Sequence, residues 1–129
     1  MPIDPVKQAE ELAQIFFNLS NAVDDFRLRN FNALSPTEQQ RLKDQAQALD
    51  TRGQQYTADA LGAILQGIQP HLQNIKQATQ SAQDALAHLN NVVKAITIVD
   101  AAVLVGSIVT GDLGSIGDNV QCLFQAIDT

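Results

Sequence analysis

LGAILQGIQPHLQNIKQATQSAQDALAHLNNVVKAITIVDAAV, residues 61–103, is the stretch that decides the fold class. Mostly apolar side chains recur along it at alternating steps of four and three residues. The positions are Leu61, Leu65, Ile68, Leu72, Ile75, Thr79, Ala82, Leu86, Leu89, Val93, Ile96, Asp100 and Val103. This heptad spacing is typical of amphipathic helices that pack against one another. The stretch therefore predicts long helices with one apolar stripe.

The residues before this stretch predict two further helices. Asp4 and Pro5 suit the N-cap and first position of one helix, whose apolar stripe is Leu12, Phe16, Leu19, Val23 and Phe26. Ser35, Pro36 and Glu38 supply the N-cap, the first-turn proline and the third-position glutamate of a capping box, which starts the second helix. Small side chains that allow close approach alternate with larger ones along its stripe: Leu42, Ala46, Leu49, Gly53, Tyr56 and Ala60.

The two heptad series differ in phase by one residue between Ala60 and Leu61, which makes residues 60–68 apolar nearly all round. We expect that segment in the core. Pro70 leaves two alternatives open, a helix boundary or a kink. An unbroken helix over residues 36–109 would be about 110 Å long. A turn near residues 50–53 or near Pro70 is therefore favoured.

A short helix is expected at the C-terminal end. Thr110, Gly111 and Asp112 read as a helix stop and a new N-cap, and three-four spacing returns at Leu113, Ile116, Val120, Leu123 and Ile127. The predicted fold is all-α, with residues 1–129 as a single domain. It is an antiparallel bundle of three long amphipathic helices and a short C-terminal one, packed like a coiled coil.

The amino-acid composition argues against some classes of function and favours others. The chain has 129 residues, 45% of them apolar, and a net charge of -6, which repels nucleic acid. The first residues lack the features of a secretory signal, so we expect a cytoplasmic protein and leave signal-independent export open. The charged residues of the segment 53–129 are two lysines, Lys76 and Lys94, and six aspartates. A weakly charged surface repels neighbours little and is compatible with self-association or partner docking.

Residues 92–111, VVKAITIVDAAVLVGSIVTG, match the length of a membrane span and contain only Lys94 and Asp100 as charges. Asp100 near the middle would cost about 2.5–3.5 kcal/mol on insertion scales. A central bundle helix is therefore favoured over membrane insertion. In outline, long heptad helices beside an apolar, glycine-containing hairpin are similar to the α-helical pore-forming toxins, a similarity of pattern alone. It implies a membrane-active alternative in which residues 95–109 insert and Asp100 faces a lumen.

No grouping of residues predicts an enzyme, a cofactor site or a metal site. Asp84 and His88 are four residues apart, which suits an exposed ion pair. A metal site would need a third ligand, which His71 could supply only if the fold brings it near. Asp100 occupies a stripe position, where a lone polar group often fixes register. Cys122, the only cysteine, is expected to be a small buried hydrophobe. The serines lack a nucleophile motif, and the glycines of residues 111–117 lack a phosphate-loop lysine.

The leading functional interpretation is a non-enzymatic helical interaction or assembly module. It would bind a protein partner or a second copy of itself, as a homo-oligomer, through apolar heptad positions. The candidate contact residues are Leu61, Leu65, Leu72, Leu86, Leu89 and Val93, with Asp100 as the register residue. Some of these side chains must also serve the core of the monomer. The alternative is the membrane-active protein that inserts residues 95–109.

Overall fold

A computed structural model describes residues 4–107 and 116–128. This part of the chain is helical and has no strand, which confirms the all-α prediction. The helices are α1 (Pro5–Arg29), α2 (Pro36–Gln55), α3 (Ala58–Ile68), α4 (Leu72–His88), α5 (Val92–Gly106) and α6 (Ile116–Asp128). Two 3-10 turns, Phe31–Ala33 and Gln69–His71, lie between them.

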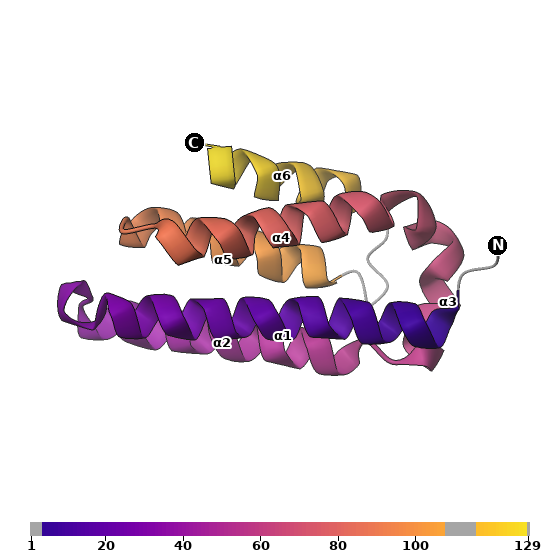
Figure 1. Cartoon of the computed structure of the whole chain (residues 1–129), viewed down its shortest axis with the longest axis horizontal. Helices are drawn as coiled ribbons and strands as arrows, with labels where there is room; N and C mark the ends of the chain where they lie inside the picture. Colours follow the sequence, from indigo (N-terminus) through magenta and orange to yellow (C-terminus); the bar gives the residue numbers. More distant parts are fainter. Residues whose placement is uncertain (1–3, 108–115, 129) are drawn as a thin grey trace.

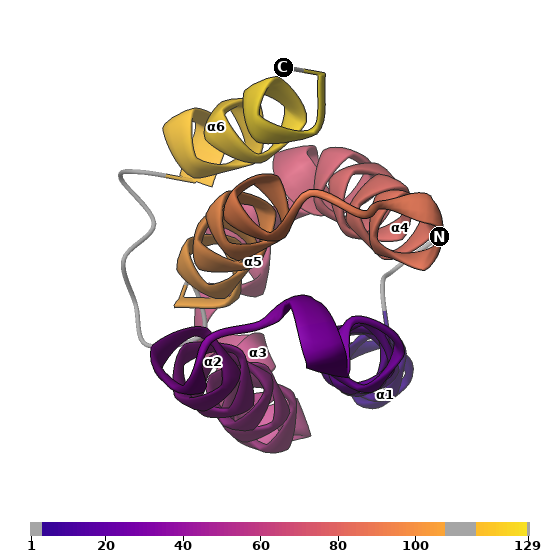
Figure 2. The same cartoon turned by 90° about the vertical axis from the view of Figure 1, so that its left-hand side faces the viewer.

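The helices form a layered bundle (Figure 1). α1 and α2 lie side by side in one layer, α4 and α5 form the next, and α6 covers α4 and α5 on their far side. The short α3 crosses one end of the bundle and connects α2 to α4. Seen from the end, α2, α5 and α6 follow one another along one side of the molecule, while α1 and α4 occupy the other (Figure 2).

α1 begins and packs as its sequence predicts. The Asp4 side chain accepts a hydrogen bond from the Val6 amide (3.0 Å), and Pro5 occupies the first turn. Every member of the predicted stripe is buried: Leu12, Phe16, Leu19, Val23 and Phe26. Beside this stripe Ile15 and Phe17 are half-buried, while Val6 and Leu28, near the two ends of the helix, are exposed.

α2 begins with the predicted capping box, in which the Ser35 hydroxyl accepts from the Glu38 amide and the Glu38 carboxylate accepts from the Ser35 amide. Its small-residue stripe is buried from Leu42 to Tyr56. Gly53 explains why small residues are needed there. A Cβ at this position would lie 2.6 Å from Phe17 Cε1 and 3.1 Å from the Ala13 carbonyl oxygen of α1, so a larger residue would push the Phe17 ring or the two helices apart.

The chain after α2 is broken more often than the predicted bundle of three long helices requires. One break follows Gln55, a second is the 3-10 turn at Pro70, and a third, unpredicted break separates His88 from Val92. The Asn91 side chain caps α5 by accepting from the Lys94 amide (3.1 Å). The expected long third helix therefore consists of α4 and α5, which fold back on each other.

The burial of the heptad series changes at this third break. Leu72, Ile75, Thr79, Ala82 and Leu86 are buried in α4, as the stripe predicts. In α5 the predicted positions Val93, Ile96, Asp100 and Val103 are exposed or half-buried. The buried side chains of that helix are Ala95, Ile98, Val99, Ala101, Ala102 and Val105. The loop between α4 and α5 turns a different face of α5 toward the core. The heptad spacing therefore continues through the sequence, but the buried stripe does not.

The predictions for residues 60–68 are met only in part. Ile68 is fully buried, whereas Ala60 is half-buried and Gly62 is exposed. The side chains of Leu61 and residues 63–66 lie outside the described part of the structure.

The apolar segment at residues 92–111 begins with α5, whose 15 residues lie between α2, α4 and α6. In the two ranges that the structure describes, no helix has both the length and the apolar character needed to cross a membrane. Residues 108–115, including the predicted stop at Thr110–Asp112 and Leu113, are outside those ranges. The short C-terminal helix is confirmed as α6, with Ile116, Val120 and Leu123 buried.

Candidate functional site

The residues predicted as contact anchors have different environments. Leu72 and Leu86 are buried in the core, and Leu89 is half-buried against it. Val93 is 70% exposed at the start of α5. The side chains of Leu61 and Leu65 lie outside the described residues. The core therefore uses Leu72 and Leu86, and among the predicted contact residues whose side chains the structure describes, Val93 is the most exposed.

Val93 belongs to a second stripe along α5, on the side away from its core face. We call Val93, Thr97, Asp100 and Leu104 the α5 seam. Leu104 is 53% exposed, Thr97 is exposed, and Asp100 is partly exposed. Their spacing of four, three and four residues is that of a coiled-coil seam. Half-buried Ile96 and Val103 widen this apolar surface toward α2.

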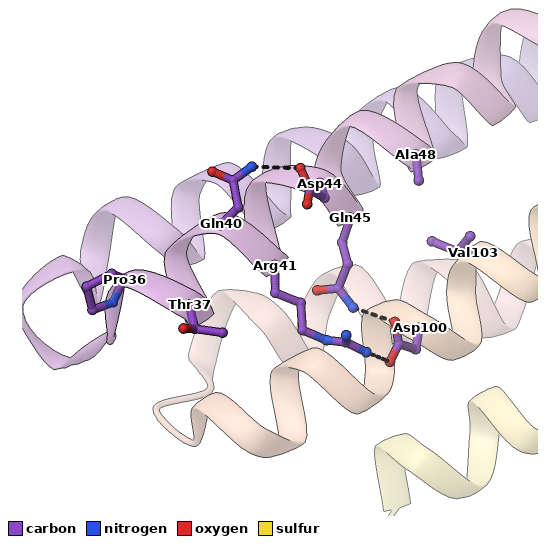
Figure 3. A pocket seen from close by; sticks show the side chains of 9 residues that line it. All are labelled: Pro36, Thr37, Gln40, Arg41, Asp44, Gln45, Ala48, Asp100 and Val103. Carbon is purple, nitrogen blue, oxygen red and sulfur yellow. Dashed lines mark hydrogen bonds and ion pairs between the residues drawn. The ribbon is translucent and has the colours of Figure 1, made fainter.

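Asp100 is held in place by two side chains of α2 (Figure 3). Its Oδ2 accepts from Arg41 Nη2 at 2.7 Å, and its Oδ1 accepts from Gln45 Nε2 at 2.6 Å. Gln45 Nε2 also donates to the Ile96 carbonyl at 3.2 Å. Both carboxylate oxygens are thus bonded, and the Arg41 charge balances that of Asp100.

The two bonds to Asp100 differ in their surroundings. The Arg41 and Asp100 side chains are about half exposed, so water screens their ion pair, which contributes at most about 1 kcal/mol. Gln45 is buried, and a hydrogen bond from a buried amide to a carboxylate contributes about 1.5–3 kcal/mol. Gln45 Oε1 is itself buried without a hydrogen-bond partner. The Gln45 bond is therefore the stronger connection between α2 and α5.

A groove of about 700 Å³ runs beside this cluster (Figure 3). One wall is the face of α2 that carries Pro36, Arg41 and Ala48, and the other is formed by Asp100 and Val103 of α5. The groove is shallow and has apolar ends with polar groups at its middle. A shallow groove of this kind can accept the side chains of a helix that packs along it. Small-molecule sites are usually more enclosed.

The far end of α5 is fixed by hydrogen bonds to its neighbours. The Tyr56 hydroxyl donates to the Gly106 carbonyl (3.2 Å), and its ring stacks on Phe16 with centroids 5.4 Å apart. Burial raises the pKa of the Tyr56 phenol, which therefore serves as a neutral donor. Asn119 of α6 donates to the Leu104 carbonyl (3.3 Å). Hydrogen bonds from Tyr56, just after α2, and from Asn119 of α6 thus hold the C-terminal end of α5 on both sides of the α5 seam.

Two smaller predictions are wrong. Asp84 accepts from Gln80 Nε2 (3.2 Å), one turn earlier, and forms no ion pair with His88. Cys122 is exposed because α6 buries Ile116, Val120 and Leu123, and Cys122 points past that stripe. Within the described ranges, no three His, Cys, Asp or Glu side chains gather as metal ligands.

No protein-family model matches this chain, and comparisons with curated proteins and with solved structures find no match either.

Proposed function

We propose that this protein is a non-enzymatic helical interaction module that binds an amphipathic helix on the α5 seam and the adjoining groove of α2. The observation that carries the proposal is the α5 seam, in which the exposed apolar residues Val93 and Leu104 flank the polar Thr97 and Asp100. Val93 and Leu104 remain mostly exposed on a helix whose other side is already in the core. Large apolar side chains aligned on one helix face are the usual anchors for a partner helix.

The polar centre of this surface supports the same function. Asp100, Arg41 and Gln45 form a bonded cluster between apolar ends. A polar group within an apolar seam selects the partner that can hydrogen-bond to it and disfavours other registers. Asp100 is thus proposed as the register residue, and the coiled-coil packing expected from the sequence is proposed for this contact.

The anchors proposed from the heptad series are revised accordingly. Val93 is kept, while Leu72 and Leu86 are assigned to the core because both are buried. Leu104 is added because it continues the exposed stripe of α5. This assignment separates binding from folding, since the two exposed residues can be changed without opening the core.

A display library of amphipathic helical peptides tests the proposal directly. We expect enriched peptides to bind the wild-type protein and to shift the backbone NMR signals of α5 and α2. Binding should fall at least tenfold with Leu104→Lys, because a lysine in the seam loses the apolar contact. Leu28→Lys, a matched change at an exposed leucine of α1, should leave it unchanged. Enriched peptides whose signals map to another face would contradict the proposal.

A further inference from the structure

We infer that the helix received by this surface is α5 of a second copy of the chain. This inference rests on the proposed function and names its partner. The two α5 helices pack antiparallel across a twofold axis that passes between Ile98 and Val99. Val93 then lies against the partner's Leu104, and Thr97 lies against the partner's Asp100.

The spacing of the α5 seam carries this inference. Residues 93 and 104 are equally far from the point between residues 98 and 99, and so are residues 97 and 100. In an antiparallel twofold pair, residues equally far from the axis face each other. Each exposed apolar residue therefore meets an apolar residue, and each polar one meets a polar one. A parallel pair would instead place Asp100 against the partner's Asp100.

The polar pair at the centre is chemically matched. Asp100 already accepts one bond on each oxygen, and its carboxylate has lone pairs left for a hydroxyl donor. The Thr97 hydroxyl donates to the Val93 carbonyl in the single chain (3.0 Å) and exchanges this bond for one to the partner's Asp100. Arg41 balances the Asp100 charge, which reduces the repulsion between the two carboxylates brought near the axis.

Charges beside the seam are complementary in the same arrangement. Lys94 lies at the Val93 end of α5, and Asp118 precedes Asn119, which bonds to α5 at its Leu104 end. In the described part of the chain neither Lys94 nor Asp118 has an ion-pair partner. Antiparallel pairing brings the Val93 end of one copy to the Leu104 end of the other, so Lys94 approaches the partner's Asp118 twice in each dimer.

The size of the face predicts a weak dimer. α2, α5 and α6 lie along one side of the bundle and form a face three helices wide (Figure 2). With helices about 9 Å apart and α5 about 20 Å long, the face covers roughly 500 Å² per copy. Both copies together bury about 1,000 Å², at the low end for specific interfaces. We therefore expect an equilibrium between monomer and dimer that depends on concentration.

Sedimentation equilibrium over a wide concentration range is the first test. We expect the wild-type mass to rise from one copy to two, and Val93→Lys or Leu104→Lys to remain monomeric with unchanged helical circular dichroism. Leu28→Lys is the matched control and should dimerise like the wild type, because that exposed leucine lies on α1. A wild-type protein that stays monomeric at the highest concentration, or seam variants that dimerise as well as the wild type, would overturn the inference.

Disulfide trapping tests the register in a Cys122→Ser background, which removes the exposed native thiol. We expect Val93→Cys and Leu104→Cys proteins to cross-link when mixed and each alone to stay uncross-linked. In the antiparallel pair, two copies of the same cysteine are about 16 Å apart, too far for a disulfide. Faster cross-linking of Val93→Cys with itself would overturn the antiparallel arrangement.

The display experiment distinguishes the binding of a partner helix in general from the pairing of two copies of this chain. A monomeric wild-type protein that still binds library helices on α5 would leave the proposed function standing and reject the second copy as partner. A monomer that binds no helix there would reject both.

Discussion

α1 and α5 are both amphipathic by their spacing, yet they use their apolar residues differently. The predicted stripe of α1 is wholly buried, from Leu12 to Phe26. α5 buries one face and leaves Val93 and Leu104 of a second face in solvent. Twelve of the 25 residues of α1 are polar, against three of the 15 residues of α5, so the buried stripe of α1 stands out more clearly from its surroundings. Periodicity identifies the inner face of a helix only when enough of the other positions are polar.

The largest effect should come from the stripe of α1. Phe16 is fully buried and stacks on Tyr56, so Phe16→Ala removes a large side chain that the core cannot readily replace. We expect it to lower the free energy of unfolding by about 3–5 kcal/mol. Urea denaturation followed by circular dichroism measures this loss.

Phe31→Ala is the matched control, because Phe31 is 57% exposed in the turn after α1. It should change the free energy of unfolding by less than about 0.5 kcal/mol. Similar losses for the two variants would show that the burial of these two residues does not determine how much each contributes to the free energy of unfolding.

The second prediction compares two helical glycines. Gly53→Ala places a Cβ 2.6 Å from Phe17 Cε1 and 3.1 Å from the Ala13 carbonyl oxygen, and we expect it to destabilise the fold by about 1–3 kcal/mol. Gly62→Ala meets no atom within 4 Å and should stabilise the fold by about 0.4–1 kcal/mol through helix propensity. Thermal unfolding of both variants measures the difference. Stabilisation by both would show that α1 and α2 are not closely packed at Gly53.

These two comparisons mark what the sequence predicts well. The caps at Asp4 and Ser35 and the stripes of α1 and α2 follow from local residue chemistry, and the structure confirms them. The loop before α5 was not predicted, because Leu89 and Val93 keep the heptad spacing across it. The neighbouring Asn90 and Asn91 were the available signal, since asparagine favours N-caps over helix interiors.

The site was predicted less completely than the fold. Asp100 stood out as the charge near the middle of an apolar segment, but its partners Arg41 and Gln45 are 59 and 55 residues away in the sequence. No periodicity links such distant positions, because helix packing determines which side chains meet. For the same reason, the exposed face of α5 was visible only after the bundle was assembled.

The third prediction ranks the two bonds that attach α5 to α2. Gln45→Ala removes the part-buried bond to Asp100 together with the unpartnered Oε1 atom, and should lower the free energy of unfolding by about 1–2 kcal/mol. Arg41→Ala removes the exposed ion pair and should cost under about 1 kcal/mol. Urea denaturation of both variants at the same low ionic strength gives the ranking, because urea is uncharged and does not screen the ion pair. A larger loss for Arg41→Ala would mean that charge, not burial, holds α5 in place.

The smallest expected effect concerns the ion pair that attaches α4 to α1. Lys76 Nζ lies 2.7 Å from Glu11 Oε2, and this hydrogen bond lowers the pKa of Glu11 below its ordinary value. A lowered folded-state pKa gives stability that is present above the unfolded-state pKa and disappears as the pH falls through the folded one. Both side chains are partly exposed, so the contribution should be under about 1 kcal/mol.

Lys76→Gln should therefore be less stable than the wild type at neutral pH, and this difference should vanish once acid has protonated Glu11. Urea denaturation at a series of pH values measures the difference. Lys43→Gln is the control, because Lys43 is an exposed residue of α2 without an ion pair in the described chain. A deficit for Lys76→Gln that stays constant as the pH falls would assign the role of Lys76 to the packing of its alkyl chain between α1 and α4, and not to its charge.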